Sequence, residues 1–377
     1  MNLIYIINTR IPTEKAYGFQ VSKTCEKFSE NGVNTELWFP KRKNPVEQNI
    51  FDYYGVKENF IVKEIPSLDL MFLNNYFGGL FFSLQSLFFA IKILFKTFPK
   101  DTVVYSRDFL IVTLLKLKGL DVVYNVHNWS KKRGLFLKLF LIKDTKIVCN
   151  SSGTKEEFSK RGFKNLISVP NGVDIEKFDV IREDKKQLRK KLGLENDKKI
   201  VLYLGHLYTW KGFDLVFNSA KKEKDERIVF VVVGGTKTDL EKYKNKKKQE
   251  RVGNIIFTGH KQQKDTPFYL KSADVLLLPN VAISEESVKY TSPIKMFEYM
   301  ASGVPIVASD LPSIREVLNE ENSLLVEQGS EEALLSGVNK ILGDKEFAES
   351  VSSTARKDVD EYTWINLNKL IIDFIKQ

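Results

Sequence analysis

The sequence predicts an α/β protein with parallel sheets, divided into two domains. Short apolar runs alternate with helical patterns along most of the chain, an order typical of parallel sheets covered by helices on both faces. A chain of 377 residues is long for one hydrophobic core and suits two domains of ordinary size. Its hydrophobic content of 43% is sufficient for globular packing.

The first half contains seven short apolar runs that we interpret as strands. The first covers residues 2–8, and the polar loop TRIPTEKAYG and a helical pattern near Phe19 follow it. The others cover residues 35–39, 60–65, 102–105, 122–126, 146–149 and 166–169. The first strand-to-helix turn has only Gly18 and therefore lacks the GxGxxG motif of dinucleotide-binding domains. Gly18 could still let a phosphate approach the backbone.

A turn at NGVD, residues 171–174, marks the passage to the second half. We therefore expect one domain over residues 1–172 and another over residues 173–361. Strands are expected at residues 200–204, 228–233, 255–257, 275–278 and 304–308. The last helix, within residues 362–377, has an apolar stripe that could pack on either domain, and we assign it to the first, on which it would pack back.

The excess of positive over negative charge is confined to the first half. Residues 1–170 hold 25 Lys and Arg against 15 Asp and Glu, whereas the remainder holds 33 of each sign. Such a half can face nucleic acid, anionic lipid or a phosphorylated substrate, and charge alone does not choose among them. Cys25 and Cys149 are far apart, and no signal peptide is evident, so a reduced cytosolic setting is expected.

Two segments of the first half are unusually apolar. Residues 76–98 have the length of a membrane span, but Gln85, Lys92 and Lys96 argue against insertion through lipid. Residues 130–146 join a basic start to an apolar body, as interfacial helices do. The two segments could form helices that face the core or helices that lie on a membrane surface, and the sequence leaves both interpretations open.

Residues 290–309 combine helix start and stop signals with a strand. Ser292 is expected to cap a helix that Pro293 opens, Gly303 ends that helix, and residues 304–308 form a strand. The order of helix, glycine turn and strand is characteristic of α/β proteins.

One charged residue of this helix suggests a ligand site. Ile294, Phe297 and Ala301 share a face, which leaves Glu298 off that face and one turn from the N-terminus. A carboxylate there can accept hydrogen bonds from a hydroxylated ligand, and the free N–H groups at Ile294 and Lys295 favour a phosphate. Together they suggest a nucleotide, although a solvated Glu on an ordinary amphipathic helix is the alternative.

Polar residues also follow several predicted strands, at the edge where open α/β sheets bind ligands. Arg107, His127 and Asn128 do so in the first half, and Lys211 stands at the start of a helix in the second. A hydrogen-bonded core histidine and an exposed lysine are the alternatives for His127 and Lys211.

Seven segments in this order resemble a family 4 retaining glycosyltransferase of the GT-B fold, in which two Rossmann-like domains face each other across a cleft. They are IPTEKAYGFQ, NVHN, PNGVD, GHLYTWKG, FTGH, ADVLLLPN and SPIKMFEYMASGVPIVASD. Each alone is weak, but seven with the family's order and spacing, over nearly the whole chain, are a specific signal.

The resemblance implies a role for each matching position. Glu298 would bind the ribose hydroxyls, Lys211 the diphosphate and His127 the transferred sugar. The remaining donor-side positions would be Gly18 beside a phosphate, Gly259 and His260 beside the base, and Ile294 and Lys295 at the helix start; Arg107 and Asn128 would lie on the acceptor side.

Two positions depart from the family pattern. Tyr290 stands where the family usually has a first glutamate, seven residues before the second, which puts the donor-sugar contact in doubt. His206 stands where an arginine often accompanies the phosphate lysine, so the charge at the diphosphate is lower or depends on pH. Specialisation and loss of activity are the two explanations.

The resemblance implies transfer of a hexose-type sugar, with retention, from a nucleoside diphosphate sugar to a glycan or polyprenyl-linked acceptor in bacterial surface polysaccharide synthesis. A UDP-sugar is favoured over a GDP-sugar, and no cofactor or metal is implied; the one DxD, at residues 358–360, is expected to be surface charge. We expect a cytoplasmic protein, with its basic half on the inner membrane surface, and no nucleic acid partner. A nucleotide-sugar epimerase or hydrolase, and an inactive relative that binds anionic lipid or nucleic acid, are the alternatives.

Overall fold

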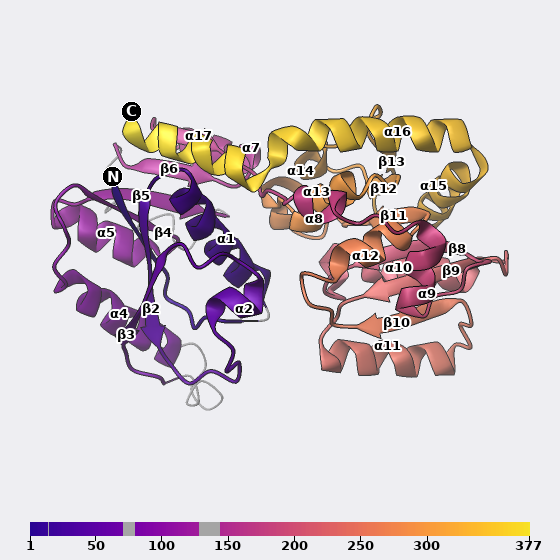
Figure 1. Ribbon diagram of the computed structural model, residues 1–377, viewed down its shortest axis with the longest axis horizontal. Helices are drawn as coiled ribbons and strands as arrows, with labels where there is room; N and C mark the ends of the chain where they lie inside the picture. The colour runs from indigo at the N-terminus through magenta and orange to yellow at the C-terminus, as the bar shows by residue number, and fades with distance from the viewer. Residues whose placement is uncertain (14, 71–79, 128–143) are drawn as a thin grey trace. The chain divides into compact units, whose positions relative to one another are not determined.

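The computed structural model describes residues 1–13, 15–70, 80–127 and 144–377. The chain forms two compact units, and each is described by itself (Figure 1). Unit 1 comprises Met1–Asn150, Thr154–Val169 and Trp364–Gln377. Unit 2 comprises Ser151–Gly153 and Pro170–Thr363.

Unit 1 contains a seven-stranded sheet in the order β3-β2-β1-β4-β5-β6-β7, with every pair of neighbours parallel. Its strands match the apolar runs of the first half: β1 (Asn2–Ile6), β2 (Asn34–Lys41), β3 (Ile61–Pro66), β4 (Thr102–Ser106), β5 (Asp121–Val126), β6 (Lys146–Cys149) and β7 (Leu166–Ser168).

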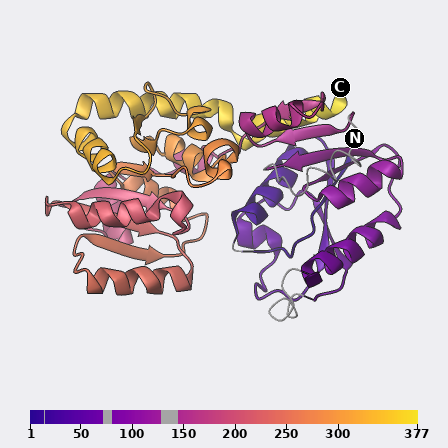
Figure 2. The same cartoon turned by 180° about the vertical axis from the view of Figure 1, so that it is seen from behind.

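Helices cover both faces of this sheet, as Figure 1 and the view from behind in Figure 2 show. They are α1 (Ala16–Glu30), α2 (Ile50–Tyr54), α4 (Leu80–Leu94), α5 (Phe109–Leu117), α7 (Ser152–Ser159) and α17 (Trp364–Lys376). One core lies between the sheet and helices α4, α5 and α7, and Phe89, Val112 and Phe158 are buried in it.

The last helix of the chain packs on the first. The rings of Phe19 on α1 and Trp364 on α17 meet edge to face at a centroid distance of 6.3 Å. At the other end of α17, Lys146 Nζ donates to the carbonyl of Ile375 at 2.6 Å. Unit 1 is therefore discontinuous in sequence, and α17 belongs to it although the whole of unit 2 precedes this helix.

Unit 2 contains a six-stranded parallel sheet in the order β10-β9-β8-β11-β12-β13. Its strands are β8 (Lys199–Leu204), β9 (Ile228–Val233), β10 (Ile255–Gly259), β11 (Val275–Leu278), β12 (Ile306–Ser309) and β13 (Leu324–Val326). Five were expected from the sequence; the edge strand β13 was not.

Two cores hold the helices of unit 2 on the two faces of this sheet. One involves α12 (Thr266–Ser272) and α13 (Ile294–Ser302), and the other α10 (Phe213–Lys222), α11 (Lys237–Gln249) and α15 (Glu331–Gly343). The remaining elements are α8 (Glu176–Asp179), α9 (Lys185–Leu192), α14 (Pro312–Arg315), α16 (Lys345–Asp358), the 3₁₀ turns Thr209–Lys211 and Val359–Tyr362, and a π-helical turn Glu286–Tyr290.

The structure answers part of the question about the apolar segments. One face of α4 is buried through Gln85, Phe89 and Ile93, so this helix packs on the sheet, but its opposite face is exposed. Residues 76–79 and most of the segment 130–146 lie outside the described residues. Among the helices that the structure describes, none has both the length and the apolar character that crossing a membrane requires.

Candidate functional site

The candidate site of unit 2 lies where the strand order reverses. Strands β8 and β11 are neighbours, but the strands that follow β8 extend to one side of the sheet and those that follow β11 extend to the other. Open α/β sheets bind ligands at such a switch point, outside the carboxyl ends of the strands. Direct pairing of the two strands is short, with Val275 opposite Val201 and Leu276 opposite Leu202.

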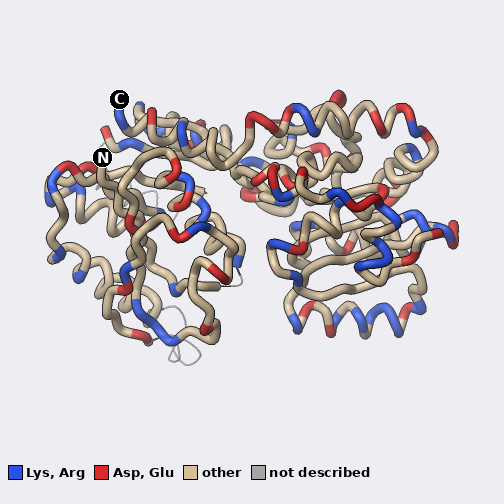
Figure 3. The backbone as a smooth tube through the Cα atoms, in the orientation of Figure 1, with Lys and Arg blue, Asp and Glu red and all other residues tan. Residues whose placement is uncertain are grey.

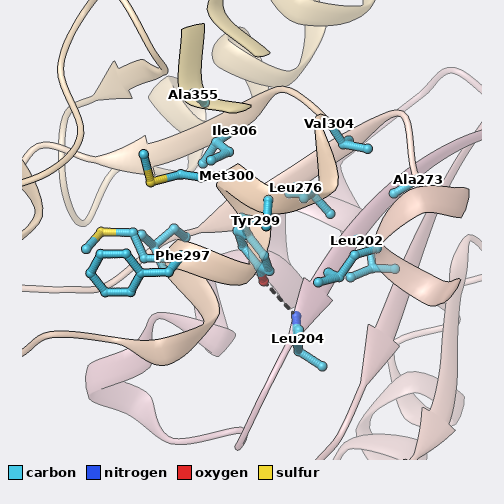
Figure 4. Close-up of a cluster of buried hydrophobic side chains, with 14 of the residues drawn as sticks. Leu202, Leu204, Ala273, Leu276, Phe297, Tyr299, Met300, Val304, Ile306 and Ala355 are labelled. Carbon is cyan, nitrogen blue, oxygen red and sulfur yellow. Dashed lines mark hydrogen bonds between the residues drawn. The ribbon is translucent and has the colours of Figure 1, made fainter. Parts of the chain in front are cut away.

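Tyr299 of α13 joins the two strands beyond the point where their pairing ends. Its hydroxyl accepts a hydrogen bond from the Leu204 N–H at 3.0 Å and donates to the Leu277 carbonyl at 3.2 Å. Figure 4 shows this side chain extending from the helix toward Leu204. Burial raises the pKa of Tyr299 above its ordinary value, so the hydroxyl stays neutral and fixes α13 across the switch point.

The boundaries of α13 differ from the expected ones by a residue or two. Pro293 is the N-cap residue and makes no side-chain cap, whereas Ser292 accepts a hydrogen bond from the N–H of Asn171 at 3.0 Å. The prediction that Ser292 caps the helix was wrong, because its hydroxyl holds the incoming linker instead. Gly303 ends the helix in the left-handed conformation with φ of 68°, as expected, and the strand begins at Ile306.

Glu298 lies inside the protein and not on a solvated helix face. Only 7% of it is exposed, and every residue from Lys295 to Ser302 is buried, so the amphipathic interpretation of this helix was wrong. Gln263 donates a hydrogen bond to Glu298 Oε1. Burial raises the pKa of Glu298 to about 7, although the Gln263 hydrogen bond and the charge of Lys177 lower it in part. Such a buried carboxyl group can accept hydrogen bonds from ligand hydroxyls.

Lys211 ends a 3₁₀ turn, and Gly212 follows it with φ of 73°. A Cβ atom at Gly212 would lie 1.6 Å from the Pro279 carbonyl oxygen, so only glycine lets the turn approach the loop after β11 this closely. The Trp210 carbonyl also accepts a hydrogen bond from the Val281 N–H at 3.1 Å. Lys211 is therefore held beside both strands of the switch point, and burial lowers its pKa to about 8.

Lys295 brings a second lysine side chain to the switch point. The sequence pattern directed attention only to its backbone N–H, but its side chain is buried, with 8% exposed. Nζ lies 4.3 Å from the ring centroid of Tyr203 and has no hydrogen-bond partner in the described part of the chain. Burial and the charge of Lys211 lower its pKa well below the ordinary value.

The other donor-side positions lie on neighbouring elements of unit 2. The ring of His206, after β8, stacks on Tyr208 at a centroid distance of 5.0 Å. Gly259 ends β10, and the exposed His260 follows it. Tyr290 is 4% exposed and ends the π-helical turn before α13. Their roles toward a base or a sugar stay predictions.

A separate polar cluster lies at the carboxyl ends of the strands in unit 1. The Asn125 side-chain oxygen accepts from Arg107 Nε at 2.8 Å and is 3.2 Å from His127 Nε2. Arg107 Nη1 also donates to the Gln20 side-chain oxygen at 3.1 Å. Burial, with the charge of Arg107, lowers the pKa of His127 well below its ordinary value. A neutral His127 that donates from Nε2 to Asn125 keeps Nδ1 as an acceptor.

Packing against Tyr54 explains why a glycine is required at position 18, without a ligand. A Cβ atom there would lie 2.0 Å from the hydroxyl of Tyr54, which accepts from the Thr13 N–H at 2.7 Å and donates to the Thr13 carbonyl at 2.9 Å. The Gly18 N–H is bonded to the Lys15 carbonyl at 3.0 Å, so the expected backbone approach of a phosphate stays a prediction. Asn128 lies outside the described residues.

The acidic residues of the DxD sequence make local contacts. Asp358 accepts from Asn322 Nδ2 at 2.9 Å, and Asp360 pairs with Arg356 at 3.1 Å. Over the residues that the structure describes, no group of three or more His, Cys, Asp or Glu side chains could hold a metal ion.

The fold is that of proteins with two Rossmann-like domains of the GT-B class. Residues 184–358, within unit 2, match the family described as Glycosyl transferases group 1. The solved structure of Alr3699/HepE from Anabaena in complex with UDP superposes with a TM-score of 0.78 at 15% identity, over 100% of each chain, and shows the likeness of fold.

Curated relatives match a shorter part of the chain. An uncharacterized glycosyltransferase of Methanocaldococcus jannaschii is 26% identical over 234 residues, which are 61% of this chain and 56% of the relative. The putative teichuronic acid biosynthesis glycosyltransferase TuaC of Bacillus subtilis is 27% identical over 63% of this chain and 57% of its own length. The similarity therefore spans a little over half of each of these relatives.

Proposed function

We propose that the protein is a retaining glycosyltransferase that moves a hexose-type sugar from a nucleoside diphosphate sugar to a glycan or lipid-linked acceptor. The observation that carries this proposal is the switch point of unit 2, where the buried carboxyl group of Glu298 on α13 and the lysine of the turn before Gly212 lie beside the neighbouring strands β8 and β11. The match of residues 184–358 to a glycosyltransferase family supports it.

The chemistry of the site suits a nucleotide donor. Lys211 and the N-terminus of α13 would stabilise the negative charge that develops on the departing diphosphate, and Glu298 would accept from the ribose hydroxyls. The UDP in the Anabaena complex supports a uridine nucleotide, and no metal cofactor is part of the proposal. The biosynthetic role in the name of TuaC supports an acceptor in surface polysaccharide synthesis.

Two substitutions test this assignment. Glu298→Ala and Lys211→Ala should each lower transfer at least tenfold, the scale of one lost charge-assisted contact. Glu346→Ala, on the exposed first turn of α16, is the matched control and should leave turnover unchanged. Wild-type rates in both site variants would exclude the site.

The donor and the reaction class need separate measurements. A thermal-shift screen with UDP-, GDP- and TDP-sugars should single out a uridine nucleotide, because a bound ligand raises the melting temperature. Product analysis with and without acceptor separates transfer from epimerisation and hydrolysis. If no nucleotide raised the melting temperature while salt-sensitive binding to RNA or liposomes persisted, the inactive-relative alternative would hold.

We also propose that unit 1 meets a lipid-linked acceptor at the cytoplasmic face of the plasma membrane through α4. The exposed side of this helix and the residue just after it form an apolar stripe: Leu84, Leu87, Phe88, Ile91 and Phe95. Phe95 is 81% exposed. The exposed Lys92 lies beside the stripe, and Figure 3 shows basic positions along this part of unit 1. An apolar stripe flanked by lysines is suited to an anionic lipid surface.

Vesicle co-sedimentation tests this surface. The protein should sediment with vesicles that contain anionic phospholipid at low salt, and Phe88→Ser with Phe95→Ser should abolish sedimentation without lowering nucleotide affinity. The matched control is Leu370→Ser on α17, a half-exposed apolar residue outside the stripe. A failure of the wild-type protein to sediment would refute the proposal.

A further inference from the structure

Lys295 occupies a position that costs free energy in the absence of a ligand. Its side chain is more than nine-tenths buried, and its Nζ finds no hydrogen-bond acceptor among the described residues. A buried ammonium group without acceptors is unfavourable, because it loses its hydration without replacement. The Tyr203 ring lies 4.3 Å from Nζ but leaves its N–H donors unsatisfied.

The side chain extends across the ligand-binding edge of the sheet. Helix α13 packs on the face of the sheet that presents Leu202 and Leu204, because Phe297 and Tyr299 belong to that core. Tyr203 points to the opposite face, into the core of α10. To reach the Tyr203 ring from α13, Lys295 must pass the switch point between β8 and β11.

Lys211 approaches the same place from the other face. The 3₁₀ turn that carries it leads directly into α10, and its charge acts on Lys295. Burial lowers the pKa of Lys211, and no carboxylate of the described residues forms an ion pair with it. Burial and the charge of Lys211 therefore disfavour the ammonium form of Lys295 in the free protein, and a phosphate group bound there would hold both lysines in their charged form and neutralise them.

We propose that the Lys295 ammonium group binds the diphosphate of the donor together with Lys211, supplying the second positive charge at a site where His206 stands in place of an arginine. This inference rests on the proposed function and adds a specificity-determining residue to it. A diphosphate carries enough negative charge for both lysines, whereas a nucleoside engages neither.

Affinities for uridine, UMP and UDP, measured by calorimetry on Lys295→Met, test the role. The variant should lose at least tenfold in UDP affinity and change less than twofold for uridine, so the ratio of the two affinities collapses. Its melting temperature without nucleotide should stay equal or rise, because Met fills the same space without a buried charge. A purely structural lysine would give a lower melting temperature and an unchanged affinity ratio.

Two further variants keep the outcome decisive. Lys295→Gln, which is neutral but polar, should lose UDP affinity to the same extent, and Lys244→Met on the exposed side of α11 should lose none. If the wild-type protein binds UDP and Lys295→Met binds it equally well, the role of Lys295 is refuted while the proposed function stands. If the wild-type protein binds no nucleotide, the proposed function fails, and this inference fails with it.

Discussion

Replacing Glu298 with Gln should stabilise the free protein at alkaline pH and weaken its binding of nucleotide. Gln has the shape of Glu, and its side-chain oxygen can still accept the hydrogen bond from Gln263. What the substitution removes is the ionisable group. Glu298 is 7% exposed, and the charge of Lys177 and the hydrogen bond from Gln263 offset the effect of burial only in part.

The pKa of Glu298 gives the size of the effect. Burial raises it from 4.5 to about 7, so the folded protein retains a proton that the unfolded chain releases between these values. The stability of the wild-type protein should therefore fall as pH rises through this range, with a cost of about 3 kcal/mol above it. Glu298→Gln should recover this free energy at pH 8 and almost none of it near pH 4.5.

Thermal unfolding with and without UDP measures both effects. At pH 8 the variant should melt on the order of 6 to 12 °C above the wild-type protein, and the difference should shrink toward zero near pH 4.5. The UDP-induced shift should be smaller in the variant, because ribose hydroxyls donate more strongly to a carboxylate than to an amide. Glu346→Gln on α16 is the exposed control. A difference in melting temperature that does not change with pH would refute the reasoning.

Three further substitutions probe the scaffold of the two units. Gly212→Ala should cost at least about 2 kcal/mol and lower UDP affinity, whereas Gly303→Ala, with a similar φ but open space around it, should cost about 1 kcal/mol. Arg189→Met should lower the free energy of unfolding by about 2 kcal/mol in urea titrations, because it removes the buried guanidinium group that pairs with Asp274 at 2.6 Å, while Asp274 keeps its contact with Lys185. Trp364→Ala should cost about 3 kcal/mol in the same titrations, and Leu370→Ala, half exposed on the same helix, less than about 1 kcal/mol.

The sequence predicted the strands well because buried parallel strands are continuous apolar runs. The edge strand β13 escaped detection because its three residues are only partly buried and make a run too short to recognise. The wrong prediction for Ser292 has a similar origin, since a serine before Pro293 fits a cap, and only the fold brings Asn171 close enough to take its hydroxyl.

Part of the candidate site also depends on contacts between segments far apart in sequence. Glu298 and Lys211 were identified as site residues because motifs mark them, but their roles toward a ligand stay predictions. Gln263 lies 35 positions from Glu298, and nothing in the sequence around Gln263 indicates that its side chain donates a hydrogen bond to a carboxylate. The side chain of Lys295 has the same character, because its importance comes from a buried location, whereas the sequence pattern directed attention only to its backbone N–H.

The place of α17 has a consequence for how the chain acquires its structure. During synthesis, residues 1–169 leave the ribosome long before the helix that covers α1. The surface that Trp364 later occupies beside Phe19 must therefore wait, apolar and uncovered, while all of unit 2 is made. The first unit to be translated is thus the last to be completed. A nascent chain halted before Trp364 would expose the apolar surface of α1, to which chaperones could bind.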